Sequence, residues 1–232
     1  ASVVADERNA SPGLAAALIG TEVVRADRIG KLVLLRTDGP TLGLHFGMTG
    51  RLIVDEVPAL DRLEYGSSRD LAPWDRFCIE FADGGVLRVN DPRRWATFTL
   101  DPDVSRLGPD LFDVTADELA SALGRRRTSV KAVLLDQRAI AGLGNLLVDE
   151  LLWQSSIDPA RRADELLSDE VLRLHATMRT ELPAMLARGG SHTGTISPAV
   201  RALLPPCPRD GAGLTRRRVG GRTTVSCLLH QR

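Results

Sequence analysis

The sequence predicts an α+β protein in which a β-rich half comes first, a helical region follows and a small hairpin ends the chain. Three observations carry this prediction. Short β-rich runs alternate with turn sequences over residues 18–100, the apolar spacing becomes helical after Thr115, and a glycine-tipped segment flanked by cysteines occupies residues 207–230. The domains expected from these changes are 1–112, 113–200 and 201–232.

The β-rich half contains seven short runs separated by turn signals such as Asp38-Gly39-Pro40 and Asp83-Gly84-Gly85. Short strands at this spacing are typical of an antiparallel sandwich or barrel. The seven expected strands are Glu22–Asp27, Leu32–Thr37, Thr41–His45, Arg51–Asp55, Phe77–Phe81, Val86–Val89 and Thr97–Leu100.

Helical periodicity governs the next part of the chain. Thr115 and Ser168 carry hydroxyl groups just before apolar-periodic segments, so both are expected to cap helix N-termini. After Gly189-Gly190 the chain becomes rich in proline and poor in helical pattern. The expected helices are Ala116–Leu123, Val130–Leu135, Leu146–Gln154, Ser168–Met178 and Arg179–Ala187.

Composition limits the classes of partner. The 232 residues include 30 basic and 30 acidic side chains and carry zero formal charge, so a polyanion would have to bind a local basic face. No run approaches the ~18 apolar residues of a membrane span, and no secretory signal is evident. Three cysteines argue against a disulfide framework. We therefore expect a cytoplasmic monomer without membrane contact.

The segment Gln137–Glu150 has the pattern of a phosphate-binding turn. Gly142 and Gly144 precede Asn145 and an amphipathic run, which describes a tight turn that opens a helix. Backbone N–H groups at such a turn can hold a phosphate, and the Asn145 amide can add a contact. The basic residues Arg125, Arg126, Arg127 and Lys131 precede it closely. The alternative is an ordinary helix corner beside a solvated basic face.

The C-terminal segment has metal-ligand spacing. Cys207 and Asp210 form one pair with a two-residue gap, and Cys227 and His230 form a second. Paired gaps of this kind suit zinc, although the carboxylate is a weaker ligand than a thiolate. The alternative is a metal-free hairpin held by its own packing. Its Gly220-Gly221 tip presents Arg222, whose guanidinium is suited to phosphate.

Two further loops carry bulky or basic side chains between strands. Met48 lies in His45-Phe-Gly-Met-Thr-Gly50, and Arg93 and Trp95 lie in Asn90-Asp-Pro-Arg-Arg-Trp95. Exposed side chains of these kinds can wedge into a base stack where a nucleotide has been extruded. For Met48 or Trp95 taken alone, core packing is the alternative. Lys31, after Gly30 at the start of a strand, is either solvated or paired with a phosphate.

Together these segments resemble the formamidopyrimidine-DNA glycosylase and endonuclease VIII family, in the family's order through nearly the whole chain. The resemblance rests on Arg28-Ile-Gly-Lys31, the loop at 45–50, Asp91-Pro-Arg-Arg-Trp95, Leu107-Gly-Pro-Asp110, the turn at 130–157 and the cysteine spacing at 207–230. It implies an N-terminal antiparallel β-sandwich, a helical domain with a helix–two-turn–helix motif, and a zinc-finger-like β-hairpin.

The resemblance also implies roles for individual residues. Asn145 and Lys131 would hold the phosphates that flank a lesion in double-stranded damaged DNA, with Arg126 and Arg127 nearby. Met48, Arg93 and Trp95 would fill the void left by the extruded base. Lys31 and Arg222 would be the residues linked to strand cleavage, and Cys207, Asp210, Cys227 and His230 would hold a structural zinc ion.

The start of the chain departs from the family. The family uses an N-terminal Pro-Glu pair, in which the proline amine attacks the sugar and the glutamate handles protons. This chain begins Ala1-Ser2-Val3-Val4, which matches the family's second structural element. We therefore expect the first helix and the catalytic segment to be absent, either because the protein is a non-catalytic relative or because the chain is a fragment.

Three hypotheses follow. The first is a base-excision glycosylase and abasic-site lyase that, as this chain stands, binds damaged duplex DNA without turnover. The second is a non-catalytic relative that recognises or shields lesions. The third is a partner-binding protein that has kept the fold and lost the DNA.

Overall fold

The computed structural model describes residues 2–60, 63–64 and 66–232, and contacts divide the chain into two compact units, Ala1–Ser105 and Arg106–Arg232. The C-terminal hairpin packs within the second unit. The division at residues 112 and 200 that the sequence suggests remains a prediction. Each unit is described by itself.

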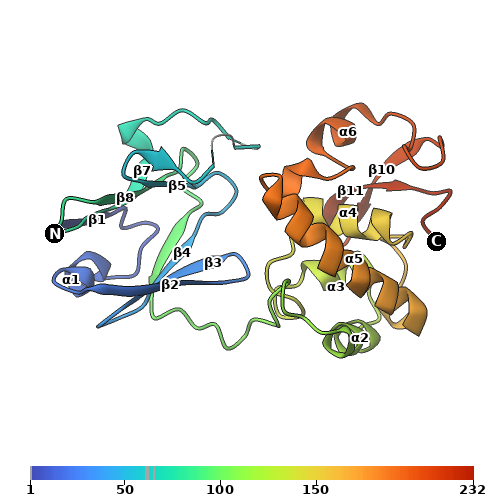
Figure 1. The fold of residues 1–232 in the computed structure, drawn as a ribbon, viewed down its shortest axis with the longest axis horizontal. Coiled ribbons are helices and arrows are strands. Elements are labelled where there is room, and N and C mark those ends of the chain that lie inside the picture. Colours follow the sequence, from blue (N-terminus) through green and yellow to red (C-terminus); the bar gives the residue numbers. More distant parts are fainter. Residues whose placement is uncertain (1, 61–62, 65) are drawn as a thin grey trace. The chain divides into compact units, whose positions relative to one another are not determined.

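The first unit is a sandwich of two antiparallel sheets, as predicted (Figure 1). Its five-stranded sheet has the order β1-β7-β8-β5-β6, and its four-stranded sheet has the order β2-β3-β4-β9. The strands are β1 (Ser2–Ala5), β2 (Val23–Ile29), β3 (Leu32–Thr37), β4 (Leu42–His45), β5 (Arg51–Val54), β6 (Val57–Pro58), β7 (Asp75–Glu80), β8 (Val86–Asn90) and β9 (Thr97–Leu100).

The core of this unit lies between the two sheets. Phe77 of β7 stacks on Phe98 of β9, with ring centroids 4.9 Å apart, so each sheet contributes a buried ring. The short helix α1 (Leu14–Leu18) adds its two buried leucines to the same cluster. Burial of alternate side chains from facing strands is what holds a sandwich together.

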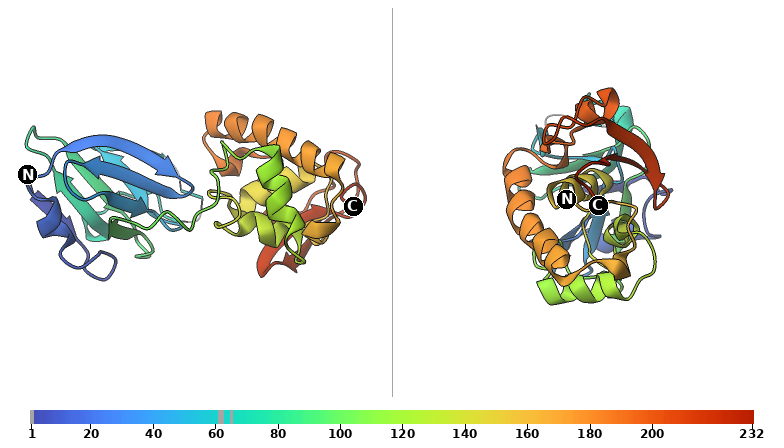
Figure 2. Two further views of the ribbon diagram at one scale, coloured as in Figure 1. Left: turned by 90° about the horizontal axis from the view of Figure 1, so that it is seen from below. Right: turned by 90° about the vertical axis from the view of Figure 1, so that its right-hand side faces the viewer.

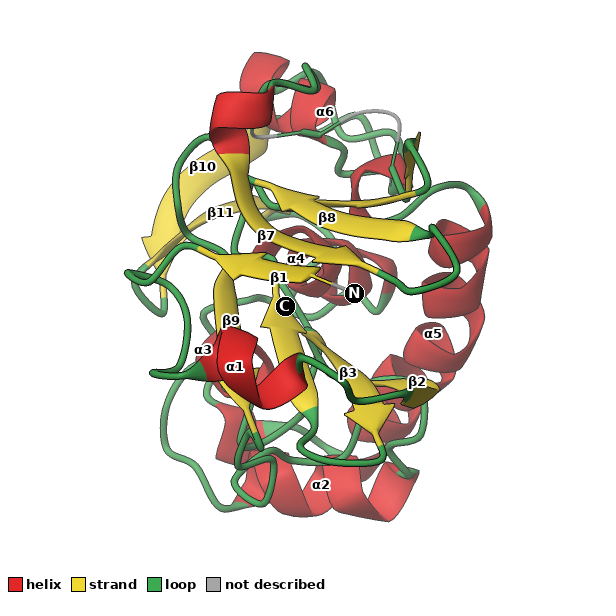
Figure 3. Ribbon diagram, turned by 90° about the vertical axis from the view of Figure 1, so that its left-hand side faces the viewer, coloured by secondary structure: helices red, strands yellow, loops and turns green. Residues whose placement is uncertain are grey.

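Three elements of the first unit were not predicted: β1, α1 and β6. β1 pairs with β7 in antiparallel register at one edge of the sheet (Figure 3). Only Val3 and Ala5 of this strand are partly buried. Two half-buried residues give too short an alternation to identify a strand from sequence.

The second unit is built on five helices and a hairpin. The helices are α2 (Ala116–Gly124), α3 (Val130–Leu135), α4 (Asn145–Gln154), α5 (Ser168–Ala187) and α6 (Pro198–Leu203). Short 3-10 turns occur at Ala163–Glu165 and Ser191–Thr193, and at Ala72–Trp74 in the first unit. The hairpin strands are β10 (Leu214–Val219) and β11 (Arg222–Cys227).

Helix α5 is continuous where two helices were predicted (Figure 2). Met178, Leu182 and Met185 are all buried, so its apolar face continues past the expected break. The prediction for its N-cap was wrong by one residue. Leu167 is the N-cap, and the Glu170 carboxylate accepts the Leu167 N–H. Thr115 was predicted correctly, since it forms a capping box with Glu118.

The turn between α3 and α4 is closed by the side chain of Gln137. Its amide nitrogen donates to the carbonyls of Leu135 and Leu143, and its amide oxygen accepts the Gly142 N–H. One side chain therefore connects both ends of the turn and sets where α4 begins. α4 then runs through the centre of the unit, with apolar and charged side chains buried on all sides. Asn145 is its first residue.

The hairpin tip lies against α3. Gly220 and Gly221 form a two-residue loop with φ of 57° and 76°, the left-handed values that a type I′ turn requires. A Cβ atom at Gly220 would lie 3.0 Å from the Cβ of Ala132 in α3. Among the helices of the described residues, none has the length and hydropathy needed to cross a bilayer.

Candidate nucleic-acid interface

In the first unit, Met48, Arg93 and Trp95 stand exposed on the two loops that the sequence singled out. Met48 is 52% exposed and Trp95 is 47% exposed, so neither belongs to the core. The Arg93 guanidinium lies 5.1 Å from the centroid of the Trp95 ring. A flat ring covered by a cation is a surface on which a nucleobase can stack.

A buried carboxylate, Asp91, organises both loops. It is 0% exposed and accepts four hydrogen bonds: from the Thr49 hydroxyl at 2.5 Å, and from the backbone N–H groups of Arg93, Trp95 and Ala96 at 3.1, 2.6 and 2.7 Å. The carboxylate therefore folds the Trp95 loop around itself and fastens the Met48 loop to it.

The Met48 loop also depends on a glycine. Gly47 has φ of +60°, and a Cβ at this position would lie 2.7 Å from the Trp95 carbonyl oxygen and 2.8 Å from the Trp95 Cβ. The loops approach so closely that no side chain fits between them.

Lys31 is exposed in the tight turn between β2 and β3. The neighbouring imidazole of His45 is partly buried, and burial followed by the Lys31 charge lowers its pKa. A neutral His45 and a charged Lys31 therefore share this end of the sheet.

In the second unit, Asn145 contacts the hairpin strand at the residue that follows Arg222. Arg222 is exposed at the first position of β11. The Asn145 amide nitrogen donates to the carbonyl of the next residue, Thr223, at 3.0 Å. The N-terminus of α4, which carries the positive end of the helix dipole, therefore lies against the backbone of the strand that begins with Arg222. Among the described residues, the buried Asn145 amide oxygen has no hydrogen-bond partner.

Lys131 is not where a phosphate contact would require it. The side chain is 0% exposed, and its ammonium donates to Asp149 Oδ1 at 2.5 Å, to the Thr223 carbonyl at 3.2 Å and to the Thr224 hydroxyl at 2.8 Å. All three N–H groups are thus used internally. Burial lowers the pKa of Lys131, and the Asp149 carboxylate opposes that shift.

The expectation that Lys131 binds phosphate directly is therefore corrected. Lys131 supports the hairpin from behind instead. The Thr224 hydroxyl that accepts from Lys131 donates in turn to the Arg222 carbonyl at 3.1 Å. A chain of two hydrogen bonds connects the buried ammonium to the backbone of the exposed arginine.

Arg126 and Arg127, which precede α3, differ in how firmly an ion pair holds each side chain. Arg126 is ion-paired with Asp136. Arg127 is 88% exposed and reaches Asp164 at only 3.9 Å, so a phosphate can displace that contact at little cost.

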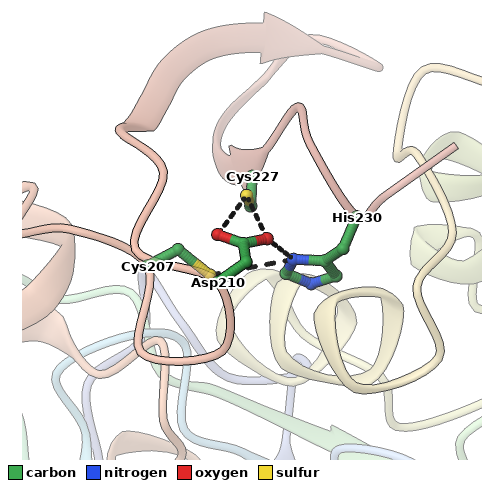
Figure 4. A group of neighbouring side chains, drawn as sticks. All are labelled: Cys207, Asp210, Cys227 and His230. Carbon is green, nitrogen blue, oxygen red and sulfur yellow. Dashed lines mark hydrogen bonds and ion pairs between the residues drawn. The ribbon is translucent and has the colours of Figure 1, made fainter.

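The four residues with metal-ligand spacing converge at the base of the hairpin (Figure 4). One ligand atom from each of Cys207, Asp210, Cys227 and His230 lies within 4.8 Å of all the others. Zinc bonds of about 2.0–2.3 Å place tetrahedral ligands roughly 3.3–3.8 Å apart, so the donor set fits such an ion after small movements.

The surroundings of this cluster favour the charged form of Asp210, while burial raises the pKa of the Cys227 thiol. Hydrogen bonds from the Ala212 backbone and from His230 hold the pKa of Asp210 well below its usual value. His230 Nε2 lies 3.3 Å from the Trp153 carbonyl, which leaves Nδ1 directed at the other ligands. The side chains could hold one metal ion that joins the two ends of the hairpin.

Sequence reasoning missed three positioning residues: Asp91, Asp149 and Arg201. Each is an acid or an arginine with no special spacing, and each acts through partners remote in the chain. Asp91 has one signal, its place at the start of a loop whose backbone N–H groups need an acceptor.

Comparison with known proteins places the chain in a family. The model of the formamidopyrimidine-DNA glycosylase N-terminal domain matches residues 2–98, and the model of that enzyme's H2TH domain matches residues 107–197. Because the first match begins at residue 2, the expectation that the family's N-terminal catalytic segment is missing is not confirmed.

Individual relatives have the same family assignment as the matching domain models. The chain is 36% identical to the formamidopyrimidine-DNA glycosylase of Thermomicrobium roseum, over 88% of this chain and 80% of that one. It is 35% identical to that of Moorella thermoacetica, over 90% and 74%.

Two solved structures have the same fold, and each match covers 100% of this chain and 91% of the other. One is a complex of the Lactococcus lactis Fpg with DNA that contains an abasic site (TM-score 0.79, 25% identity), and the other is MutM with DNA that contains carbocyclic 8-oxo-G (TM-score 0.82, 25% identity). The sequence matches, the domain order and the fold together lead to one conclusion: the chain belongs to the formamidopyrimidine-DNA glycosylase family.

Proposed function

We propose that this chain binds damaged double-stranded DNA, with the α4 N-terminus and the hairpin tip on the sugar–phosphate backbone and the Met48, Arg93 and Trp95 side chains in the base stack. The observation that carries the proposal is the hydrogen bond from Asn145 to the Thr223 carbonyl. It joins a helix N-terminus to the strand that begins with the exposed Arg222, in a protein whose net charge is zero.

The loops of the first unit support the lesion-specific part of the proposal. Met48 and Trp95 are exposed although they are large and apolar, and a buried carboxylate holds their loops in place. Exposed apolar side chains on rigid loops are suited to fill the space of an extruded nucleotide. The DNA in two solved relatives, which contains an abasic site in one and carbocyclic 8-oxo-G in the other, supports the choice of damaged DNA as the ligand.

Binding is tested with a fluorescent duplex that contains a tetrahydrofuran abasic-site analogue. The logarithm of the binding constant should fall linearly with the logarithm of salt concentration, with a slope of about −0.9 per phosphate contact. Arg222→Ala should flatten that slope by about 1. Arg173→Ala is the matched control, because this α5 arginine contacts Asp169 and Glu170 of its own helix and the Ser155 carbonyl, and not the hairpin strands. Absence of salt-sensitive binding would refute the proposal.

Catalysis forms a second part of the proposal. We infer that bound lesion DNA undergoes base excision and strand cleavage, with Lys31 and Arg222 as the residues of this chain linked to cleavage. Borohydride reduction with abasic DNA separates the two classes of function. A covalent protein–DNA adduct supports the lyase, because only an amine nucleophile forms a reducible Schiff base. Tight binding without an adduct supports the non-catalytic relative.

We also infer that the cluster of Cys207, Asp210, Cys227 and His230 holds a structural zinc ion. Two thiolates and one imidazole are preferred zinc ligands, and the Asp210 carboxylate completes four. The ion would fasten the base of the hairpin whose tip carries Arg222.

A further inference from the structure

Helix α6 contacts both strands of the hairpin through two arginines. Arg201 of α6 donates to the Thr223 carbonyl of β11 at 2.9 Å. In the opposite direction, Arg216 of β10 donates to the carbonyls of Arg201 and Ala202, at the C-terminal end of α6. A cation at this end of a helix satisfies carbonyls that have no partner within the helix.

Arg201 is directed inward, away from a direct role in binding DNA. Its side chain is 11% exposed, one terminal guanidinium nitrogen is paired with the buried Asp149 and the other terminal nitrogen donates to the Thr223 carbonyl. Asp149 Oδ2 also accepts the Val225 N–H at 3.2 Å. Arg201 therefore joins a buried carboxylate of α4 to the strand that begins with Arg222.

The Thr223 carbonyl is the point where three elements meet. It accepts from Lys131 of α3 at 3.2 Å, from Asn145 of α4 at 3.0 Å and from Arg201 of α6 at 2.9 Å. Three donors from three helices fix the carbonyl of the residue that directly follows Arg222. The pairing of two hairpin strands does not itself require three side-chain donors on one carbonyl.

Polar contacts are the main attachment of α6. The helix has no fully buried side chain, and Leu203 is 81% exposed. Only Val200 and the following Leu204 are packed, partly buried, against an apolar cluster. Loss of the Arg201 side chain should therefore loosen the hairpin strand β11 from the helix, while the Arg216 contacts to backbone carbonyls still hold β10.

We propose that Arg201 is a positioning residue for DNA binding, which sets the backbone at Thr223 and so directs Arg222 toward the phosphate. This inference rests on the proposed function, since it assigns a second residue to the Arg222 contact. Arg201 touches no DNA itself.

A double-mutant cycle with the abasic-analogue duplex tests the assignment. We expect Arg201→Ala and Arg222→Ala each to weaken binding about tenfold, and the double variant to bind within about twofold of Arg222→Ala alone. The salt slope should flatten by about 1 in all three variants, because only one phosphate contact is lost. Arg201→Lys should be intermediate, since an ammonium can keep the Asp149 pair without reaching both acceptors.

Two results would overturn the assignment. One is wild-type affinity in Arg201→Ala. The other is a double variant whose loss is the product of the single losses and whose salt slope flattens by about 2, because Arg201 would then contact a phosphate of its own.

Hydrogen exchange without DNA keeps the inference separate from the proposed function. Amides of residues 214–227 should lose protection in Arg201→Ala and keep it in the control Arg173→Ala. If the wild-type chain does not bind the duplex, the proposed function fails, and exchange alone decides whether Arg201 orders the hairpin. Unchanged protection in Arg201→Ala would refute the positioning role.

Discussion

The Thr49 hydroxyl donates a 2.5 Å hydrogen bond to the buried carboxylate of Asp91, 42 residues later in the chain. Through this bond the loop that carries Met48 is attached to the loop that carries Arg93 and Trp95. The three exposed side chains therefore depend on one internal acceptor.

Replacement of that acceptor should destabilise the first unit. Asp91→Asn turns an N–H group toward backbone donors at Trp95 and Ala96, so we expect the free energy of unfolding to fall by roughly 2–4 kcal/mol. Thr49→Val removes only one bond and should cost about 1 kcal/mol. Urea denaturation measures both. Equal stability of Asp91→Asn and the wild type would show that the four contacts are energetically unimportant.

The Trp95 ring and the Arg93 guanidinium should contribute to DNA binding in different ways. Trp95→Ala should weaken binding to the abasic-analogue duplex by about 1–3 kcal/mol, the usual contribution of a stacked aromatic side chain, and leave the salt slope unchanged. Arg93→Ala should also weaken binding, and it should flatten the slope by about 1, because it removes a positive charge from the bound complex. An intact duplex is the control, because it offers no hole for the ring to fill. Equal losses on both duplexes would contradict a void-filling role.

Lys131 should contribute to the stability of the fold and should not make a phosphate contact of its own. Removal of one partner from a buried ion pair costs roughly 3–5 kcal/mol, and Asp149 keeps Arg201, so Lys131→Met should lie near 3 kcal/mol. Its salt slope on DNA should change only as much as that of Arg222→Ala, because the lysine acts through the hairpin. Thermal unfolding and a salt titration measure the two effects. A stable variant with an additional slope change would restore the direct phosphate contact.

One metal ion per chain should depend on the hairpin cysteines. Elemental analysis is expected to find one equivalent of zinc in the wild type and none in Cys207→Ala, since loss of one of four ligands opens a structural site. Cys78→Ala is the matched control, because Cys78 lies in β7 of the other unit. A well-folded wild-type protein without metal would refute the zinc assignment and leave the DNA-binding proposal in place.

The Arg126–Asp136 pair should make stability depend on pH in the acidic range. Burial would raise the pKa of Asp136, but hydrogen bonds from Arg126 and the Arg138 backbone outweigh it, and the pKa lies below the ordinary value of 3.8. A lowered pKa means that the stabilisation is present above 3.8 and disappears as pH falls through the folded-state value.

The melting temperature of Asp136→Asn should therefore lie below that of the wild type at pH 7 and approach it below pH 3.8. Asp169→Asn, which removes an exposed carboxylate 3.9 Å from Arg173, serves as control. A difference that is constant with pH would exclude this linkage.

Local patterns in the sequence were sufficient to predict much of the fold. Strands β3 and β9 and helix α3 have the predicted bounds, because each combines a clear period with turn signals at its ends. The capping residue Thr115 and the glycine turn at 220–221 were also predicted, since both depend on chemistry within four residues. Short elements with few buried residues, such as β1 and α6, were missed for lack of such a pattern.

The internal support of the candidate site could not be predicted because it depends on contacts between remote residues. Lys131 stands close to three arginines and was assigned to the surface with them. Asp149, 18 residues away, and Thr224, 93 residues away, enclose its ammonium group in the folded chain. Tertiary packing decides whether a lysine faces solvent or an internal carboxylate. The composition and spacing of the sequence do not predict that packing.

The close approach of Gly47 to Trp95 has a consequence for engineering. The contact at Trp95 is to the carbonyl oxygen, the carbonyl carbon and Cβ, atoms that all residues except glycine share. Position 95 can therefore be varied in a library to change the stacking group, and the loop geometry should persist. Position 47 cannot be varied in the same way, because any added carbon would separate the two loops that present the group.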